Sequence, residues 1–478
     1  DGGRRLVNGW EVIVNRRILQ ALPILAVVAL AACSGGAMNR SLVPPNAAVT
    51  QDADLPPDAL AGPASGDVPF LTAEPVRQLC PASGAADQMR CFASVRTDVM
   101  PTLTAQPQVE SDVQSEAETC PFSAGEGYCP IDLQQAYKLP SLTRGKGKTV
   151  AIVDAFGYHH AAADLAIFRR TMGLKACGTA DKCLRIVNQE GHSSPLPGEP
   201  PPSDDWRGEQ SLDLDMVSGI CPNCKIILVQ TNDNHTSNLY AGVAEAGRLG
   251  VKYIANSWGG GPEGSDNKIF HQPGVVITAA AGDNGGGGRY GGGPVQPCTF
   301  TYVVCIGGTR LLRAQNPRGW SESVWNDLNF DQCSGPCGAT GSACSTTIAK
   351  PPWQTDTGCK KRSAADTSAS ASLRSPVIVY NSEIGCSPPG CFWAFGGTSE
   401  STQIIAAVYA LAENAANQTG PSYFWKHHKD NVNDVTHGNN IDPRIGSTCA
   451  SSVKYICTAH LGFDGPTGWG TPKGIGAF

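Results

Sequence analysis

The sequence predicts an α/β fold in which a mostly parallel central sheet is covered by helices on both faces. From about Cys120 onward, strand-like and helix-like segments alternate along the chain, which is the pattern of parallel strands joined by crossover helices. The strand-like segments are continuous apolar runs, as expected where a strand is buried on both faces. No internal repeat interrupts this pattern.

The alternation begins with residues 148–154, Lys-Thr-Val-Ala-Ile-Val-Asp, an apolar run that indicates a buried strand. A helix is expected over residues 161–172, and a second helix follows around Glu209. The next strand is expected at residues 225–230, and the next helix at 239–249.

Three further strands are expected at residues 251–256, 274–280 and 302–306. The last expected element is a helix, because residues 404–411 form an apolar run with the length and alanine content of a buried helix. This helix lies directly behind Ser399.

The cysteines predict a disulfide-rich protein. Setting Cys33 aside leaves 18 of the 19 cysteines, an even number that indicates disulfides made in an oxidising compartment. They fall into close neighbours: 80/91, 120/129, 177/183, 221/224, 298/305, 333/337, 344/359, 386/391 and 449/457. Spacing does not fix connectivity, so local pairing is a working hypothesis. Cys221-Pro-Asn-Cys224 also matches half a zinc site or a redox motif, but no second CxxC or matching His pair accompanies it, which favours a disulfide.

The first 33 residues are predicted to be a signal peptide. Arg16 and Arg17 precede a 15-residue apolar run, residues 18–32, which is shorter than a membrane span. The run ends in Leu-Ala-Ala-Cys, which resembles a bacterial lipobox, so we expect Cys33 to be lipidated. The alternative is an ordinary signal peptide followed by an unrelated cysteine. Either way, we expect an exported protein that is lipid-anchored at the cell envelope or extracellular.

Residues 34–118 are rich in Ala, Pro, Ser, Asp and Gln and poor in aromatic residues. This composition predicts a flexible tether or short pro-like segment, with one possible disulfide loop from Cys80 to Cys91. The folded domain is expected to comprise residues 119–478. The formal net charge of -6 argues against a nucleic-acid partner, and we expect a monomer that touches a membrane only through its lipid anchor.

Glu209 and Asp213 form the most informative motif of the chain. They are four residues apart in Glu-Gln-Ser-Leu-Asp, so on a helix both side chains lie on one face. One carboxylate can then orient the other, and the outer one can take a proton from a serine hydroxyl. A lone ExxxD is usually a solvated pair of helix charges, so the motif depends on its companions.

Ser399 is the candidate nucleophile. It follows Gly396-Gly397-Thr398 at the start of the expected apolar helix, where free N–H groups favour a developing oxyanion. The plainer interpretation is an N-cap serine. Asp283 follows an apolar strand in Ala-Gly-Asp-Asn-Gly, and an aspartate in that context is most often a turn residue.

Taken together, these motifs resemble those of the sedolisin family of serine-carboxyl peptidases, which are acid-active relatives of the subtilisins. The resemblance runs from about Gly127 to the C-terminus. It rests on residues 147–154, 209–213, 256–259, 281–283, 307–309, 397–399, 434–436 and 462–472. It implies a subtilisin-like three-layer sandwich and makes residues 119–478 the peptidase domain.

The resemblance also implies roles for single residues. Ser399 matches the nucleophile, Glu209 the general base and Asp213 the carboxylate that orients it. Asp283 matches the oxyanion-hole acid. Two further matches are accessory: Asp154 is at the position of a carboxylate that extends the hydrogen-bond chain, and Ser257, Trp258 and Gly259 match an edge segment that pairs with extended substrate.

A calcium site is implied as well. Asp434 and Asp464 would supply carboxylate oxygens, and the backbone carbonyls of Val435, His460 and Gly462 would complete the site. The expected function is therefore a calcium-binding acid endopeptidase that acts on peptides or unfolded proteins. We expect activity to peak below about pH 5, because a glutamate base and a protonated Asp283 both require acid conditions.

Two departures from the family pattern follow the nucleophile. The family continues with small residues and then proline, whereas this chain has Glu400 and Gln403. These residues favour one alternative, a catalytically inactive peptidase-like surface protein that binds peptides. A second alternative is a tripeptide-releasing exopeptidase. A third, a subtilisin-type Asp-His-Ser peptidase, needs a His-Gly-Ser/Thr motif, and the sequence contains none.

Overall fold

The computed structural model describes residues 76–80, 85–104, 119–286, 295–328, 337–385, 391–441, 449 and 453–478. The chain divides into Asp1–Ala64, all of it outside the described residues, and Ser65–Phe478, which holds every element described below. The expected signal peptide and Cys33 therefore lie outside the described residues. Within the described ranges, the structure contains no helix that is both long and apolar enough to span a membrane.

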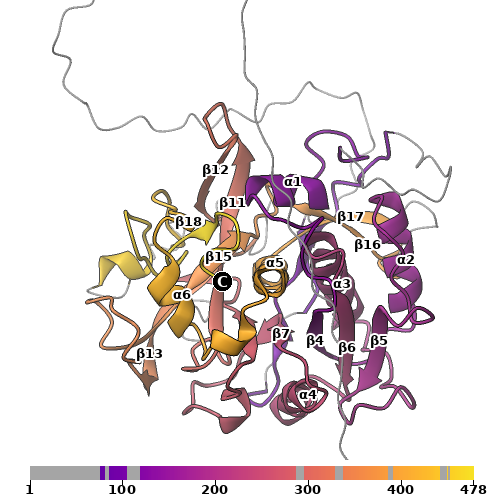
Figure 1. The fold of residues 1–478 in the computed structure, drawn as a ribbon, viewed down its shortest axis with the longest axis horizontal. Helices are drawn as coiled ribbons and strands as arrows, with labels where there is room; N and C mark the ends of the chain where they lie inside the picture. Colours follow the sequence, from indigo (N-terminus) through magenta and orange to yellow (C-terminus); the bar gives the residue numbers. More distant parts are fainter. Residues whose placement is uncertain are drawn as a thin grey trace, which may run out of the picture. The chain divides into compact units, whose positions relative to one another are not determined.

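An eight-stranded sheet forms the centre of the domain (Figure 1). Its strands lie in the order β12-β11-β9-β7-β4-β6-β5, and β15 pairs with β11. Every neighbouring pair is parallel except β11 and β12. The bounds are β4 Thr149–Ala155, β5 Leu184–Asn188, β6 Lys225–Thr231, β7 Tyr253–Asn256, β9 Val276–Ala280, β11 Val304–Arg313, β12 Trp320–Val324 and β15 Thr367–Ser370.

Helices cover both faces of this sheet. A Cβ atom built on Gly242 of α4 (Thr236–Arg248) would lie 2.7 Å from the Val153 side chain of β4. The neighbouring residue Asp154 points to the opposite face, because side chains alternate along a strand, and there it interacts with Glu209 of α3 (Trp206–Ile220). The helix, sheet and helix layers confirm the predicted α/β class with a mostly parallel central sheet.

Helix α5 (Thr398–Ala412) is buried along almost its whole length and packs on β7, β9, β11 and β15. It lies at the centre of the molecule in Figure 1. The apolar run 404–411 predicted only its second half, because the first turns carry polar residues that are also buried. These polar residues lie at the candidate site.

A second sheet and several short elements surround the core. The sheet has the order β1-β3-β17-β16, and all of its pairs are antiparallel. Its strands are β1 Val76–Gln78, β3 Ser94–Arg96, β16 Val377–Tyr380 and β17 Phe392–Gly396. The other strands are β2 Arg90–Cys91, β8 Trp258–Gly259, β10 Asn284–Gly286, β13 Ala339–Ala349, β14 Lys361–Ala364, β18 Val432–Asn433 and β19 Thr471–Pro472. The remaining helices are α1 Pro130–Ala136, α2 Ala161–Thr171 and α6 Ser422–His427.

The segment expected to be a tether differs from that expectation. Strands β1, β2 and β3 all lie between residues 76 and 96, well before the boundary expected at residue 119. Leu79, Phe92 and Val95 are buried there. The composition of residues 34–118 as a whole hid this short ordered stretch.

The disulfides follow the local pairing hypothesis. Seven of the predicted pairs are present: Cys80–Cys91, Cys120–Cys129, Cys177–Cys183, Cys221–Cys224, Cys298–Cys305, Cys344–Cys359 and Cys449–Cys457. The pairs 333/337 and 386/391 each include a residue outside the described ranges. Cys221 and Cys224 are therefore joined to each other and are not free to bind zinc.

Candidate active site

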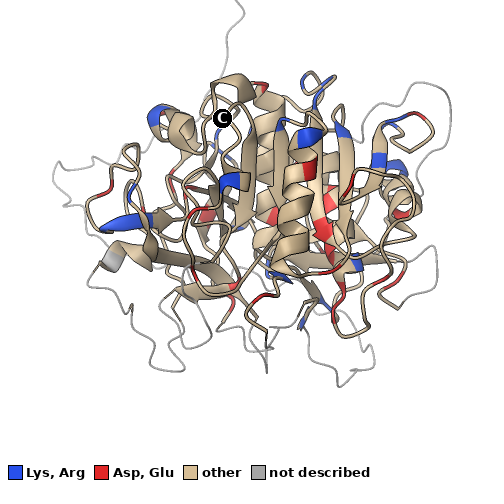
Figure 2. Ribbon diagram, turned by 90° about the horizontal axis from the view of Figure 1, so that it is seen from below, with Lys and Arg blue, Asp and Glu red and all other residues tan. Residues whose placement is uncertain are grey.

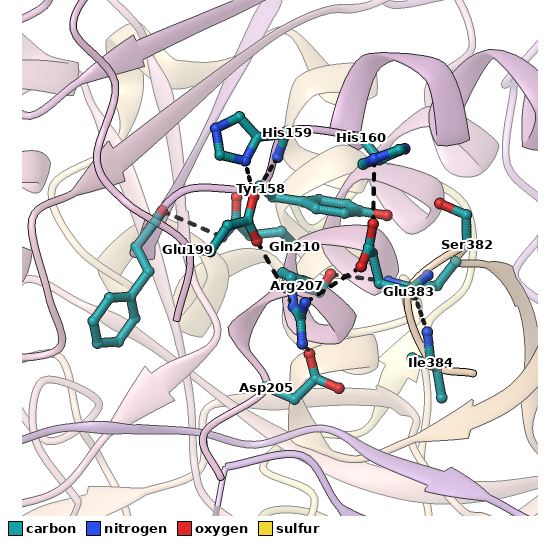
Figure 3. Close-up of polar contacts among 12 residues, drawn as sticks. Tyr158, His159, His160, Glu199, Asp205, Arg207, Gln210, Ser382, Glu383 and Ile384 are labelled. Atoms are coloured by element: carbon teal, nitrogen blue, oxygen red, sulfur yellow. Dashed lines mark hydrogen bonds and ion pairs between the residues drawn. The ribbon is translucent and has the colours of Figure 1, made fainter. Parts of the chain in front are cut away.

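Helix α3 carries Glu209 and Asp213 one turn apart, and both side chains are fully buried. The start of the helix is held by Arg207, which forms ion pairs with Asp205 at 3.3 Å and with Glu383 at 3.4 Å (Figure 3). Gln210 donates a hydrogen bond to the Ala155 carbonyl at 3.1 Å. These contacts fix the turn that aims Glu209 into the domain.

Ser399 lies in the first turn of α5. Gly397 is the N-cap, with φ of 123°, a left-handed conformation that favours glycine. The Ser399 hydroxyl donates a hydrogen bond to the Ser257 carbonyl at 3.2 Å. The first backbone N–H groups of this helix have no partner within the helix; that of Thr398 donates to Asp283 at 2.9 Å and that of Ser399 donates to the Phe92 carbonyl at 3.4 Å.

Asp283 is joined directly to the start of α5. Its Oδ1 accepts hydrogen bonds from the Thr398 backbone nitrogen at 2.9 Å and from the Thr398 hydroxyl at 2.7 Å. Sequence reasoning named the glycines and the serine of this motif but missed Thr398, which aligns the acid. The Gly-Thr-Ser spacing was the available signal.

Four buried carboxyl groups belong to this region: Asp154, Glu209, Asp213 and Asp283. Figure 2 shows acidic residues within the central helices and strands. Burial raises the pKa of Asp154 to about 8 and that of Asp283 to about 7. In Asp283 the hydrogen bonds from Thr398 and the charge of Arg90 oppose part of this effect.

Glu209 is at the centre of the group. Burial, and then the charge of Asp154, raise the pKa of Glu209 well above its ordinary value, while interactions with Ser399 and Asp213 lower it in part. Neither Glu209 oxygen makes a hydrogen bond of full standard geometry to another described residue. The side chains of Glu209, Ser399 and Asp213 are therefore neighbours, but the contacts that Glu209 makes with the other two are looser than ideal hydrogen bonds. Such contacts often tighten only when substrate binds.

Asp213 has a partner that sequence reasoning did not assign. The Gln403 amide nitrogen donates hydrogen bonds to Asp213 Oδ2 and, at 2.9 Å, to the Ser257 hydroxyl. Gln403 is one turn after Ser399 on the same helix face. Gln403, which stands where the family pattern has proline, thus supplies a hydrogen-bond donor to Asp213, the carboxylate predicted to orient Glu209.

Glu400, the other departure, is directed elsewhere. It is fully buried and interacts with Ser370 of β15. Burial raises the pKa of Glu400 well above its ordinary value, which favours a neutral carboxyl group there. Glu400 is not among the main causes of the pKa changes of Glu209 or Asp283. Although Glu400 adjoins Ser399 in sequence, its side chain interacts with Ser370 of β15.

The accessory residues of the predicted edge segment line the same region. Trp258 is fully buried, and its indole nitrogen donates to the Val153 carbonyl at 2.7 Å. Trp258 and Gly259 form β8, which pairs in antiparallel fashion with β2 of the N-terminal segment. The Ser257 carbonyl and hydroxyl contact Ser399 and Gln403 as described above.

The residues predicted to bind calcium are close together near the C-terminus. The Gly462 nitrogen donates to Asp434 at 2.8 Å, and the His460 nitrogen donates to Asp464 at 3.3 Å. Val435 donates a backbone hydrogen bond to Asp434. Burial, with a smaller contribution from the like charge of Asp434, raises the pKa of Asp464 to about 8, although hydrogen bonds from Thr467 and His460 oppose part of this rise. A hard cation between these carboxylates would relieve that repulsion, so the donor set is compatible with calcium.

Another cluster of potential metal ligands is excluded by its chemistry. Among the described residues, Cys120, Cys129 and Asp132 have ligand atoms close together. The two cysteines are joined in a disulfide, so their sulfur atoms are not available as thiolates.

Comparison with known proteins agrees with this architecture. The model of the subtilase family matches residues 195–446. Kumamolisin from Bacillus sp. (strain MN-32) is 28% identical over 401 residues, which cover 78% of this chain and 65% of kumamolisin. The chain thus spans just under two thirds of that relative. Among solved structures, Pseudomonas sedolisin, a serine-carboxyl proteinase in complex with pseudo-iodotyrostatin, has a TM-score of 0.56 at 22% identity, and the match covers 73% of this chain and 95% of that structure.

Proposed function

Because this chain belongs to the subtilase family, within which its motifs and its likeness to kumamolisin indicate a sedolisin-type member, we propose that it is an acid-active serine-carboxyl endopeptidase. The observation that carries the proposal is the position of Ser399 at the buried start of α5, next to Glu209 of α3 and Asp283. Peptides and unfolded proteins are the proposed substrates.

In the proposed reaction Ser399 attacks the substrate carbonyl while Glu209 takes the hydroxyl proton. The same proton is then given to the leaving amine. Asp213 orients Glu209, and Gln403 holds Asp213 through its amide. Burial, and then the charges of Asp154 and Glu209, raise the pKa of Asp213 well above its ordinary value, and an interaction with Ser257 opposes part of this rise.

The oxyanion would be stabilised by the Ser399 backbone N–H and by Asp283. A carboxyl group donates a hydrogen bond only when it is protonated, and the pKa of Asp283, raised to about 7 by burial, allows this in acid. Asp283 Oδ1 is occupied by Thr398, which leaves Oδ2 to carry the donated proton. Asp154, with a pKa of about 8, would stay protonated and extend the chain of carboxyl groups.

The histidines support a carboxylate base rather than a histidine base. His159 pairs with Glu199, and His160 lies 3.3 Å from Glu383 (Figure 3). Both are more than half exposed, whereas Ser399 is fully buried beside Glu209. The arrangement is therefore compatible with a Glu base and leaves these two histidines in surface ion pairs.

We further propose that the protein is exported, lipid-anchored through Cys33 and monomeric. The dense disulfides support an oxidising compartment. We also propose one calcium ion bound by Asp434, Asp464 and the carbonyls of Val435, His460 and Gly462. When bound, the cation would hold the C-terminal segments in place and would take no part in proton transfer.

The deciding experiment is hydrolysis of an unfolded protein between pH 3 and pH 8. Wild type is compared with Ser399→Ala and Glu209→Gln, each checked for a native thermal transition. The proposal requires acid-limited activity that both variants lose. Full activity at pH 8, or a Glu209→Gln variant as active as wild type, would contradict it.

A further inference from the structure

Glu400, the residue after the candidate nucleophile, is a buried carboxyl group that the proposed reaction does not use. Its side chain is fully buried in the first turns of α5, defined here as residues 398–403. Neither Glu400 oxygen makes a hydrogen bond of full standard geometry to another described residue, and the same holds for the hydroxyl of Ser370, with which Glu400 interacts. Within the described ranges, no lysine or arginine forms an ion pair with Glu400.

A second buried glutamate shows what a charged carboxylate requires in this part of the fold. The side chain of Glu322 in β12 is 2% exposed. It accepts hydrogen bonds at 2.6–3.1 Å from four donors, which are the hydroxyl groups of Thr309, Thr471 and Tyr137 and the guanidinium group of Arg318. Donors to the charged form favour that form. Glu322 is therefore built to be charged, whereas Glu400 is not.

The electrostatic surroundings of Glu400 are acidic. Tyr137 donates to Glu322 and accepts a hydrogen bond from the Ser370 nitrogen at 2.8 Å. Burial, then the charge of Glu322 and to a smaller extent that of Glu400, raise the pKa of Tyr137. A charged Glu400 would thus face a charged Glu322 across a neutral phenol. Arg318 cannot neutralise both, because it already pairs with Glu322 at 2.7 Å.

Other elements packed on α5 carry ionisable groups as well, but none is among the causes of the pKa change of Glu400. These groups are Asp154 of β4, Arg207, Glu209, Asp213 and Asp215 of α3, Tyr253 of β7, Asp283 after β9, and Arg310 and Arg313 of β11.

Protonation of Glu400 is therefore linked to the docking of the helix. Burial raises the pKa of Glu400 well above 4.5, and the interaction with Ser370 opposes part of this rise. A Glu400 side chain that has left its buried site would titrate near 4.5 and would release a proton that the docked form keeps. Docking is thus favoured below about pH 4.5 and weakens as pH rises toward the raised pKa.

The first turns of α5 are built to move more easily than the rest of the helix. The hydroxyl groups of Ser401 and Thr402 donate to the Thr398 carbonyl at 3.0 and 2.6 Å, a type of bond that weakens and bends helices. Two glycines precede these turns, and the N-cap Gly397 has φ of 123°. Residues 404–411, in contrast, are buried and almost entirely apolar. The glycines provide a hinge about which the first turns can move while the second half of α5 stays packed.

We propose that Glu400 is a pH latch on the candidate site. Neutral Glu400 allows the first turns of α5 to dock on β15, and ionised Glu400 displaces them, because the buried site offers the charge no partner. Thr398 moves with these turns, so Asp283 loses the two hydrogen bonds that align it, and Ser399 moves away from Glu209. The consequence for activity rests on the proposed function, whereas the movement of α5 does not.

Hydrogen exchange tests the latch without any catalysis. The amides of residues 402–406 bond to carbonyl groups of the first turns and the turn after them. Between pH 5 and pH 7, their protection factors, corrected for the pH dependence of exchange in free peptides, should fall in wild type by more than about tenfold, since one released proton changes the docking equilibrium by up to about tenfold per pH unit. Glu400→Gln, which keeps the shape of the side chain, and Glu400→Ala, which removes it, should both lose most of this fall.

Glu413→Gln is the matched control. Glu413 is the carboxylate at the other end of α5 and lies 3.5 Å from Lys148 at the surface. This variant should keep the wild-type pH dependence of residues 402–406. In all of these proteins α4, which lies on the opposite face of the sheet, should keep its protection.

Three results would overturn the latch. The first is a fall in protection as large in Glu400→Gln as in wild type, and the second is no fall in wild type. The third is an equal loss of protection in α4, which would mean that the domain unfolds as a whole. If residues 402–406 behave as expected but wild type digests no unfolded protein at pH 4, the latch stands and the peptidase proposal fails.

Discussion

At the scale of single residues, the amide of Gln403 is the contact that distinguishes this site from the family pattern. It joins Asp213 to Ser257, and all three side chains are fully buried. A donor to a carboxylate favours its charged form, so Gln403 opposes the burial that raises the pKa of Asp213. Gln403 is therefore a positioning residue that acts through Asp213.

We predict that Gln403→Leu lowers kcat on a peptide substrate by about 10- to 100-fold, the effect of losing one buried hydrogen bond to a charged group. KM should change little. The acid limb of the pH profile should shift to higher pH, because the pKa of Asp213 rises when it loses a hydrogen-bond donor. Glu400→Gln is the matched control, because Glu400 is equally buried but faces Ser370. If both variants behave alike, Gln403 has only a packing role.

Asp283 gives a second prediction at this scale. If its ionisation near pH 7 removes the oxyanion donor, then Asp283→Asn should keep a donor at every pH. Relative to its own activity at pH 4, the variant should retain more activity at pH 7 than wild type does. Asp283→Ala should lose about 100- to 1000-fold in kcat. If the loss of activity between pH 4 and pH 7 is the same in Asp283→Asn as in wild type, a group other than Asp283 causes that loss.

At the scale of elements, close packing of α4 on the sheet predicts that alanine is destabilising at one glycine of this helix and nearly neutral at another. A Cβ atom at Gly242 would lie 2.7 Å from branched side chains of both Val153 and Thr231, whereas one at Gly247 would meet only the amide end of Gln272. Branched strand residues cannot move aside, but an amide can swing away.

We therefore predict that Gly242→Ala lowers the free energy of unfolding by about 1–3 kcal/mol through overpacking. That cost outweighs the gain in helix propensity of about 1 kcal/mol. Gly247→Ala has the same gain in helix propensity, which is offset by the need to move the Gln272 amide, so its net effect on the free energy of unfolding should be close to zero. Thermal midpoints of the two variants, measured together at pH 4, check the sign. Stabilisation by Gly242→Ala would mean that α4 shifts more easily on the sheet than its contacts suggest.

The sequence predicted the elements whose apolar pattern is strong. The expected strands 148–154 and 225–230 and the helix 161–172 each agree with the structure to within one residue at either end. It missed the second sheet, because short strands such as β1 and β3 lie in a stretch dominated by loop-forming residues. It also missed the first turns of α5, where buried polar residues carry no apolar period.

The candidate site shows the same division. Residue types and spacing were enough to name Ser399, Glu209, Asp213 and Asp283 as candidates. Spacing did not reveal that Gln403 contacts Asp213, since the two are 190 positions apart in sequence. Nor did it reveal that the Ser399 backbone nitrogen donates to the Phe92 carbonyl, because a contact between backbone groups does not depend on the residue types of either partner.

At the scale of the whole molecule, calcium is predicted to stabilise the fold. Asp434 and Asp464 come from segments about 30 residues apart that meet at the hydrogen bond between Gly462 and Asp434. An ion bound only by the folded state adds RT ln(1 + [Ca]/Kd), or about 2.7 kcal/mol at 100 times Kd. Millimolar calcium should raise the thermal midpoint over that in chelator. Asp464→Asn should abolish the increase, whereas Asp266→Asn, a surface control, should keep it.

The buried carboxyl groups predict that the whole domain is most stable in acid. Asp283 and Asp154 have folded-state pKa values of about 7 and about 8, whereas an unfolded aspartate has a pKa of about 3.9. Between these values the unfolded chain releases protons that the folded chain keeps, so stability falls as pH rises. Each pKa unit of difference corresponds to about 1.4 kcal/mol.

In chelator, which leaves Asp464 free of metal, the thermal midpoint should therefore be highest near pH 4 and fall steadily toward pH 8. Asp154→Asn should reduce that slope, because its amide is neutral in both the folded and the unfolded chain. The surface variant Asp266→Asn should leave the slope unchanged. A midpoint that rises from pH 4 to pH 8 would mean that paired carboxylates elsewhere dominate, and that the carboxyl cluster around Glu209 is already ionised in the folded protein.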